Sequence, residues 1–137
     1  MSRTSLEQRV EAFLDGGPHA VVGASRDRVK YGNKVLRAYQ QVGRRVFPIN
    51  PSGGEIEGLR AYASLRDLPE RVHGVSIITP PAVTERVVEE AAALGIRHIW
   101  MQPGAESAAA VARAEELGMS CIAGDACVLV VLGYREH

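Results

Sequence analysis

A glycine turn that follows a short apolar run is the part of this sequence best suited to chemistry. Ala20-Val21-Val22 leads into Gly23-Ala24-Ser25, and Gly32-Asn33 then opens a helical pattern. A strand that turns sharply into a helix frees backbone N–H groups, and the helix start adds a partial positive charge. The turn therefore predicts a binding site for a phosphate group.

Basic residues next to this turn indicate a ligand with more than one phosphate. Arg26, Arg28, Lys30 and Lys34 cluster there, and the end of the expected second strand, residues 49–52, carries no carboxylate. An NAD site would have a G-x-G-x-x-G turn and an acidic residue for the ribose hydroxyls. The cluster instead suits NADP or coenzyme A, and the alternative is a set of solvated loop charges.

The side chains that could act as nucleophiles or bases form no recognisable catalytic pattern. Ser25 has no paired base in the sequence, which favours a hydrogen bond to phosphate over nucleophilic attack. Cys127 follows a predicted strand, and an inert thiol is preferred there over a mixed disulfide with coenzyme A. The four histidines are His19, His73, His98 and His137.

Strand and helix patterns alternate along the chain and position these residues. Strands are expected at 19–22, 45–49, 58–63, 74–78, 97–101 and 119–123. Helices are expected from the capping box at residue 5 to about 15 (covering one sheet edge), at 33–42, from Pro81 to about residue 94, and at 107–117. Residues 128–132 fit either a short helix or a strand.

Such alternation predicts an α/β fold: a mainly parallel sheet with helices on both faces, in three layers. Right-handed crossovers give the strand order 3-2-1-4-5-6, with the switch between the first and fourth strands. A ligand should lie over the ends of these two strands, where the turn at 23–25 meets Thr79-Pro80-Pro81. The length of 137 residues predicts one domain, residues 1–137.

Composition excludes several classes of protein. Hydrophobic residues make up 46% of the chain and charged residues 23%, which supports a packed core. Sixteen Lys and Arg balance sixteen Asp and Glu, so a nucleic-acid partner is not expected. The amino terminus has no apolar signal region, and no apolar run approaches the ~20 residues that span a bilayer. With Cys121 and Cys127 as reduced thiols, we expect a cytoplasmic protein without a membrane partner.

In its order of short motifs, the chain resembles the CoA-binding domain family, the Rossmann-type domain that also forms the amino-terminal part of the succinyl-CoA synthetase α subunit. The matches run from about residue 18 to 132. The matching segments are Val21-Val22-Gly23-Ala24-Ser25, Val46-Phe47-Pro48-Ile49-Asn50-Pro51, Ser64-Leu65 with Leu68-Pro69, Ile77-Ile78-Thr79-Pro80-Pro81, Ile99-Trp100-Met101-Gln102-Pro103-Gly104-Ala105 and Asp125-Ala126-Cys127.

This resemblance implies that coenzyme A binds in the crevice. Phosphates would lie on the turn and the loop that follows it, the adenosine near the end of the second strand, and the pantetheine arm along the fifth. A branched side chain at position 23 would then fill the space of the pyrophosphate. The residues implied are Gly23, Ala24, Ser25, Arg26, Lys30, Gly32, Asn33, Asn50, Pro51, Ser52, Thr79, Pro80, Pro81, Gln102, Gly104 and Ala105.

Two departures from the family pattern concern charge. Stand-alone relatives often have Asp-Arg-Cys where this chain has Asp125-Ala126-Cys127. The synthetase has a lysine in the loop after the second strand, where this chain has Ser52-Gly53-Gly54. Another cation, Arg26 or Lys30, would then contact the 3′-phosphate.

The sequence therefore predicts a protein that binds coenzyme A or an acyl-CoA and has no catalytic machinery of its own. It would act as a carrier, a sensor or an accessory module. Two alternatives are an NADP-type oxidoreductase fragment and an interaction module that keeps the fold and has lost the ligand.

Overall fold

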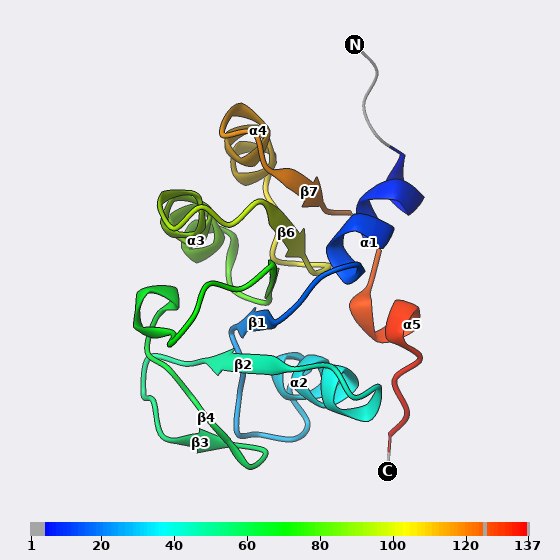
Figure 1. The fold of residues 1–137 in the computed structure, drawn as a ribbon, viewed down its shortest axis with the longest axis vertical. Helices are drawn as coiled ribbons and strands as arrows, with labels where there is room; N and C mark the ends of the chain where they lie inside the picture. Colours follow the sequence, from blue (N-terminus) through cyan, green and yellow to red (C-terminus); the bar gives the residue numbers. More distant parts are fainter. Residues whose placement is uncertain (1–4, 125, 137) are drawn as a thin grey trace.

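The computed structural model describes residues 5–124 and 126–136, and its centre is a parallel sheet. Five strands pair in the order β2-β1-β5-β6-β7 (Figure 1). Their bounds are β1 (His19–Val22), β2 (Val46–Ile49), β5 (Gly74–Ile77), β6 (His98–Met101) and β7 (Ser120–Ile122). The predicted α/β class with a mainly parallel sheet is confirmed.

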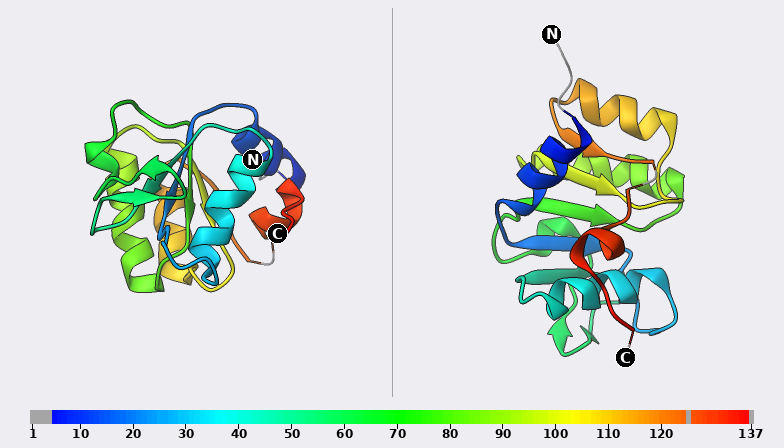
Figure 2. Two further views of the ribbon diagram at one scale, coloured as in Figure 1. Left: turned by 90° about the horizontal axis from the view of Figure 1, so that it is seen from below. Right: turned by 90° about the vertical axis from the view of Figure 1, so that its right-hand side faces the viewer.

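Helices cover both faces of the sheet, as Figure 2 shows. On one face lie α1 (Leu6–Leu14), α2 (Tyr31–Gln41) and α5 (Val128–Leu132). The other face carries α3 (Pro81–Ala93) and α4 (Ala108–Glu116), with the short 3-10 turn η1 (Leu65–Asp67). Residues 128–132, which fitted either a helix or a strand, form a helix.

Alternation along the strands divides the core into two apolar layers, because successive strand side chains point to opposite faces. In β6, Ile99 and Met101 pack under α3 and α4, whereas Trp100 packs on the side of α1 and α2. The ring of Phe13 in α1 meets Trp100 edge-on, with 5.3 Å between the ring centres. Helix α1 thus covers the β6–β7 edge of the sheet, as its sequence pattern predicts.

The prediction that residues 58–63 form an edge strand of the main sheet is wrong. That segment folds on its neighbour as a separate antiparallel hairpin of β3 (Glu55–Ile56) and β4 (Leu59–Arg60). Glu57 and Gly58 have φ of +50° and +79°, and positive φ at both central residues is typical of a two-residue hairpin turn. Within residues 58–63, Tyr62 alone pairs with the edge strand β2, through a single parallel bridge to Ile49.

The order of the strands reverses at β1, which has β2 on one side and β5 on the other. The chain leaves β1 into α2 on one face and leaves β5 into α3 on the opposite face. In open α/β sheets, ligands generally bind where the loops diverge in this way, beyond the carboxyl ends of the two strands. Within the part of the chain that the structure describes, no helix is long and apolar enough to cross a bilayer.

Candidate functional site

The turn after β1 is held by contacts between three backbone segments. Gly23 has φ of +96°, and a Cβ there would overlap the carbonyl oxygen of Ile78 at the end of β5. A Cβ on Gly32, in the first turn of α2, would overlap the carbonyl oxygen of Gly23. Both glycines are therefore required by packing. This corrects the expectation for Gly23: the space beyond its Cα is filled by the protein and is not reserved for a pyrophosphate.

Two asparagines predicted to lie at the site connect its loops to one another. Asn50 donates from Nδ2 to the carbonyl oxygen of Ala24 at 2.9 Å and accepts from the backbone N–H of Ser52 at 2.8 Å. Asn33 donates to the carbonyl oxygen of Ser25 at 2.9 Å and accepts from Arg37 at 2.7 Å. Each side-chain amide is used within the protein, so these residues hold the loops in position.

The cations of the loop after β1 have different environments. Arg28 forms an ion pair with Glu57 of the hairpin turn. A hydrogen bond from Asn33, with Arg28 nearby, lowers the pKa of the Glu57 carboxyl. Arg26 donates from Nη2 to the carbonyl oxygen of Gly53, in the loop after β2. Neither Arg26 nor Lys30 contacts a carboxylate anywhere in the described ranges, so both charges are available to a ligand.

Two helix starts at this edge have no side-chain cap. Helix α2 begins after Lys30 and helix α3 after Pro80, and neither residue bonds a first-turn N–H group through its side chain. By contrast, Ser5 caps α1 and Ser107 caps α4. The N–H groups and the partial positive charge of α2 therefore face the same region as Arg26 and Lys30.

A buried amide lies close to the first residue of α2. The Gln102 side chain, at the end of β6, accepts at Oε1 from the backbone N–H of Val128 at 2.9 Å and from the hydroxyl of Tyr31 at 3.3 Å. Its Nε2 group is buried and has no partner among residues 5–124 and 126–136. The Tyr31 hydroxyl also contacts the thiol of Cys127, and burial raises the pKa of the Tyr31 phenol, which stays protonated. An unsatisfied buried donor here suits a ligand carbonyl.

The sixteen predicted residues all follow the carboxyl ends of four strands, but they do not form one continuous contact network. The turn, the Asn50 loop and the start of α2 touch one another directly. The hydroxyl of Thr79 is hydrogen-bonded to the hydroxyl of Thr84, with 2.8 Å between the two oxygens. Gly104 and Ala105 bond within their own loop, and the Ala105 side chain is buried in the core.

Tyr31 and Glu57 were missed by sequence reasoning. Tyr31 precedes Gly32 and carries no motif, so only its place at the start of the helix could have indicated it. Glu57 reaches the site because its hairpin folds back toward α2, which no local pattern shows. The predicted motif residue Asp125 lies outside the described residues, and the carbonyl oxygen of Ala126 accepts from the Trp100 ring N–H at 3.2 Å.

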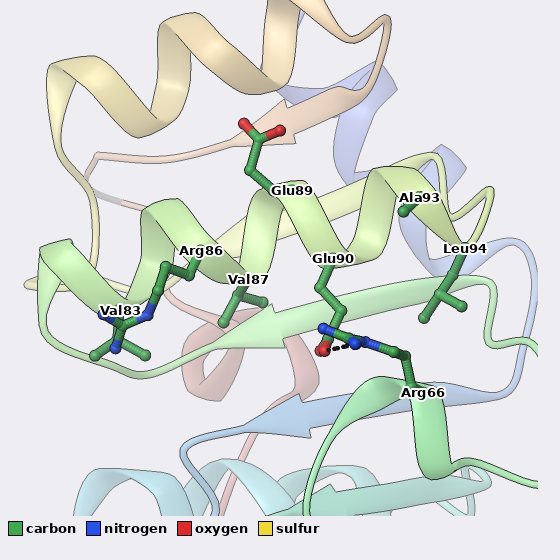
Figure 3. A pocket seen from close by; sticks show the side chains of 8 residues that line it. All are labelled: Arg66, Val83, Arg86, Val87, Glu89, Glu90, Ala93 and Leu94. Carbon is green, nitrogen blue, oxygen red and sulfur yellow. Dashed lines mark hydrogen bonds and ion pairs between the residues drawn. The ribbon is translucent and has the colours of Figure 1, made fainter.

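A separate hollow of about 470 Å³ runs along the outer side of α3 (Figure 3). Val83, Val87 and Leu94 line it, and Arg66 of η1 reaches across to Glu90. It contains none of the sixteen predicted residues. The candidate site is the group of loops that follow the carboxyl ends of β1, β2, β5 and β6, which we call the carboxyl edge.

A Rossmann-like sheet whose switch point carries this turn and these cations defines a nucleotide-binding class of domain. Comparison with family models is more specific: residues 19–133 match the CoA-binding domain model. The chain belongs to the CoA-binding domain family.

Solved structures and curated relatives agree with this assignment. A conserved hypothetical protein from Pyrococcus furiosus is 40% identical with a TM-score of 0.78, covering 82% of this chain and 97% of that one. A dinucleotide-forming acetyl-coenzyme A synthetase from Candidatus Korarchaeum cryptofilum is 26% identical with a TM-score of 0.73, over 85% of this chain and 28% of that one.

Among curated proteins, the α subunit of ADP-forming acetate–CoA ligase II from Pyrococcus furiosus is 32% identical over 93 residues, 66% of this chain. The aligned part is 20% of that subunit, and 11% of the related ligase from Methanocaldococcus jannaschii. The chain therefore spans only a small part of the length of these ligases.

Proposed function

We propose that this chain binds coenzyme A or an acyl-CoA at the carboxyl edge, as a carrier, a sensor or an accessory module without catalytic machinery of its own. The observation that carries the proposal is the layout of that edge. Arg26 and Lys30 contact no carboxylate among the described residues and lie near the uncapped start of α2. Tyr31 of that helix start contacts Gln102, whose buried Nε2 group has no partner among the same residues. Coenzyme A carries the matching groups, which are its phosphates and an arm of amide groups.

Arg26 is the residue that we assign to the 3′-phosphate. Its guanidinium lies against Gly53 and Gly54 in the loop after β2, where the resembling synthetase carries a lysine. The side chain thus brings a cation from the loop after β1 to the loop that lacks one. Guanidinium groups bind phosphate oxygens through charge-assisted hydrogen bonds. Lys30 and the start of α2 then serve the pyrophosphate.

Gln102 is the residue that we assign to the pantetheine arm. Its free Nε2 donor would bond a carbonyl of the arm, since its Oε1 is already occupied by Val128 and Tyr31. Satisfying a buried donor is worth about 1–3 kcal/mol, which favours a ligand that carries an acceptor to this depth.

The names of the relatives support coenzyme A as the ligand, because they describe ligases and synthetases that use it. Their full activity is not proposed for this chain, which aligns with 20% of the ligase subunit. The proposed role is therefore binding.

Calorimetric titration of nucleotide-stripped protein with coenzyme A, and then with NADP, tests the proposal. Binding of coenzyme A with no binding of NADP is expected. Binding of NADP alone would favour the oxidoreductase alternative. If neither ligand binds to folded protein, the proposal is wrong and an interaction module is favoured.

A further inference from the structure

The opposite edge of the sheet, where the strands begin, carries a second group of cationic and imidazole side chains. His19 opens β1, His73 directly precedes β5, and His98 opens β6. A pocket of about 300 Å³ lies beside them, lined by Arg71, His73, Arg97 and His98, with Gly17 and Gly95. We call it the amino-edge pocket, and it shares no residue with the carboxyl edge.

The two arginines of this pocket are not neutralised. Arg71 makes no hydrogen bond or ion pair with any described residue, and its Nη1 lies 3.0 Å from where a Cβ on Gly95 would be. Arg97 makes one long bond, 3.4 Å, to the carbonyl oxygen of Leu117. Among the described residues, no carboxylate lines the pocket, although the whole chain has as many acidic as basic residues. The local charge is therefore positive.

The imidazoles are fixed in a row beside the arginines. The His73 ring stacks on His98 with 4.4 Å between ring centres and bonds the carbonyl oxygen of Ala12 at 2.8 Å. A side chain on Gly16 would collide with this ring, so the glycine lets His73 pack there. His98 Nδ1 is buried and has no partner in the described part of the chain. Two arginine cations and two imidazoles thus gather with no carboxylate among the described residues that line the pocket.

We propose that the amino-edge pocket binds a phosphate dianion, either free or as the end of a small phosphomonoester. Arg71 and Arg97 would hold its oxygens from the two loops that precede β5 and β6, and the imidazoles of His73 and His98 would lie alongside. Planar guanidinium groups match the geometry of phosphate oxygens, and a pocket of this volume has room for a small organic group as well.

Titration of the full chain with inorganic phosphate, in chloride buffer free of phosphate and sulfate, tests this site. The ring resonances of His73 and His98, followed by NMR, should shift with saturating behaviour. Arg71→Gln and Arg97→Gln should each weaken binding about tenfold, because each loses a charge-assisted contact. Arg113→Gln on α4 is the matched control, since Arg113 already pairs with Glu89. Both pocket arginines are exposed, so the variants should fold.

Glycerol 3-phosphate in a parallel titration distinguishes a phosphomonoester from the free ion: tighter binding than inorganic phosphate identifies the ester, and equal or weaker binding identifies the free dianion. Arg26→Gln should leave the phosphate-induced shifts of the His73 and His98 rings unchanged. Loss of these shifts in that variant would place the ion at the carboxyl edge and overturn the proposal. So would the absence of any histidine shift with both probes, or phosphate affinity that survives both Arg71→Gln and Arg97→Gln.

Discussion

Gln102 is the residue whose chemistry distinguishes a binding site from a packed core. Its amide oxygen has two protein partners, and its amide nitrogen has none in the described part of the chain. Gln102→Glu keeps an oxygen for the Val128 N–H and replaces the free donor. We expect calorimetry to show about tenfold weaker binding of coenzyme A and of 3′-dephospho-CoA alike, because one buried hydrogen bond is lost.

Gln41→Glu is the control for this change, since Gln41 lies at the far end of α2 and bonds Arg135. It should bind coenzyme A as the unmodified chain does. Unchanged affinity in folded Gln102→Glu protein would show that the pantetheine arm does not reach Gln102.

His19 links a single side chain to the pH dependence of folding. Burial, opposed by a hydrogen bond to the carbonyl oxygen of Phe13, lowers the pKa of His19 from 6.5 to about 4, and the nearby charge of Arg44 acts in the same direction as burial. Between these two pH values the unfolded chain binds a proton that the folded chain does not. The free energy of unfolding should therefore fall as the pH falls from 6.5 to 4, by on the order of 3 kcal/mol.

Urea unfolding at a series of pH values measures this effect. His19→Gln keeps a donor near Phe13 and removes the titration, so its stability should fall less over the same range. The remaining slope would include His98, whose pKa burial also lowers. Parallel curves for the two proteins would contradict the assignment.

At the scale of elements, the start of α2 depends on one glycine. Alanine usually stabilises a helix relative to glycine by about 1 kcal/mol. At Gly32 the added Cβ would overlap the carbonyl oxygen of Gly23, so the first turn of α2 must move. We expect Gly32→Ala to lower the free energy of unfolding by about 1–3 kcal/mol and to weaken coenzyme A binding. Lys34→Ala, in the same helix, is the stability control. A Gly32→Ala protein at least as stable as the original would refute this account.

The elements that the sequence predicted well are those with strong local patterns. Buried runs such as Ala20-Val21-Val22 and the Pro81 helix start keep their predicted type because pattern, length and boundary signals agree. The strand predicted at residues 58–63 does not join the main sheet, because the two-residue turn at Glu57-Gly58 pairs β4 with the neighbouring strand β3 and not with the edge strand β2. The turn needs a positive φ at Glu57, and a glutamate in the sequence does not indicate a positive φ.

The arrangement of the loops at the carboxyl edge was predicted from the sequence, but the contacts among their side chains were not. The switch point follows from the strand order, so the turn at 23–25, the loop at 50–52 and the start of α3 could be placed together. The role of each side chain depends on distances between segments far apart in the sequence. In the structure, Asn33 and Asn50 hold the loops in position through hydrogen bonds to backbone carbonyl oxygens. The sequence did not indicate the contact that Tyr31 makes with Cys127.

For the whole molecule, the two edges of one sheet have different chemistry despite a net charge of zero. The carboxyl edge joins Arg26 and Lys30 to the buried Gln102, and the amino edge gathers Arg71, Arg97 and the histidines. Variants at one edge should therefore leave ligand binding at the other unchanged, because their side chains share no contacts and effects at distant sites add independently.

The most direct test of coenzyme A binding at the carboxyl edge is a cycle of four calorimetric titrations. The unmodified chain and Arg26→Gln are each titrated with coenzyme A and with 3′-dephospho-CoA. If Arg26 holds the 3′-phosphate, the unmodified chain prefers coenzyme A by about tenfold or more, and Arg26→Gln loses this preference while binding 3′-dephospho-CoA as before. The same preference in both proteins, or no binding of either ligand, would contradict the account.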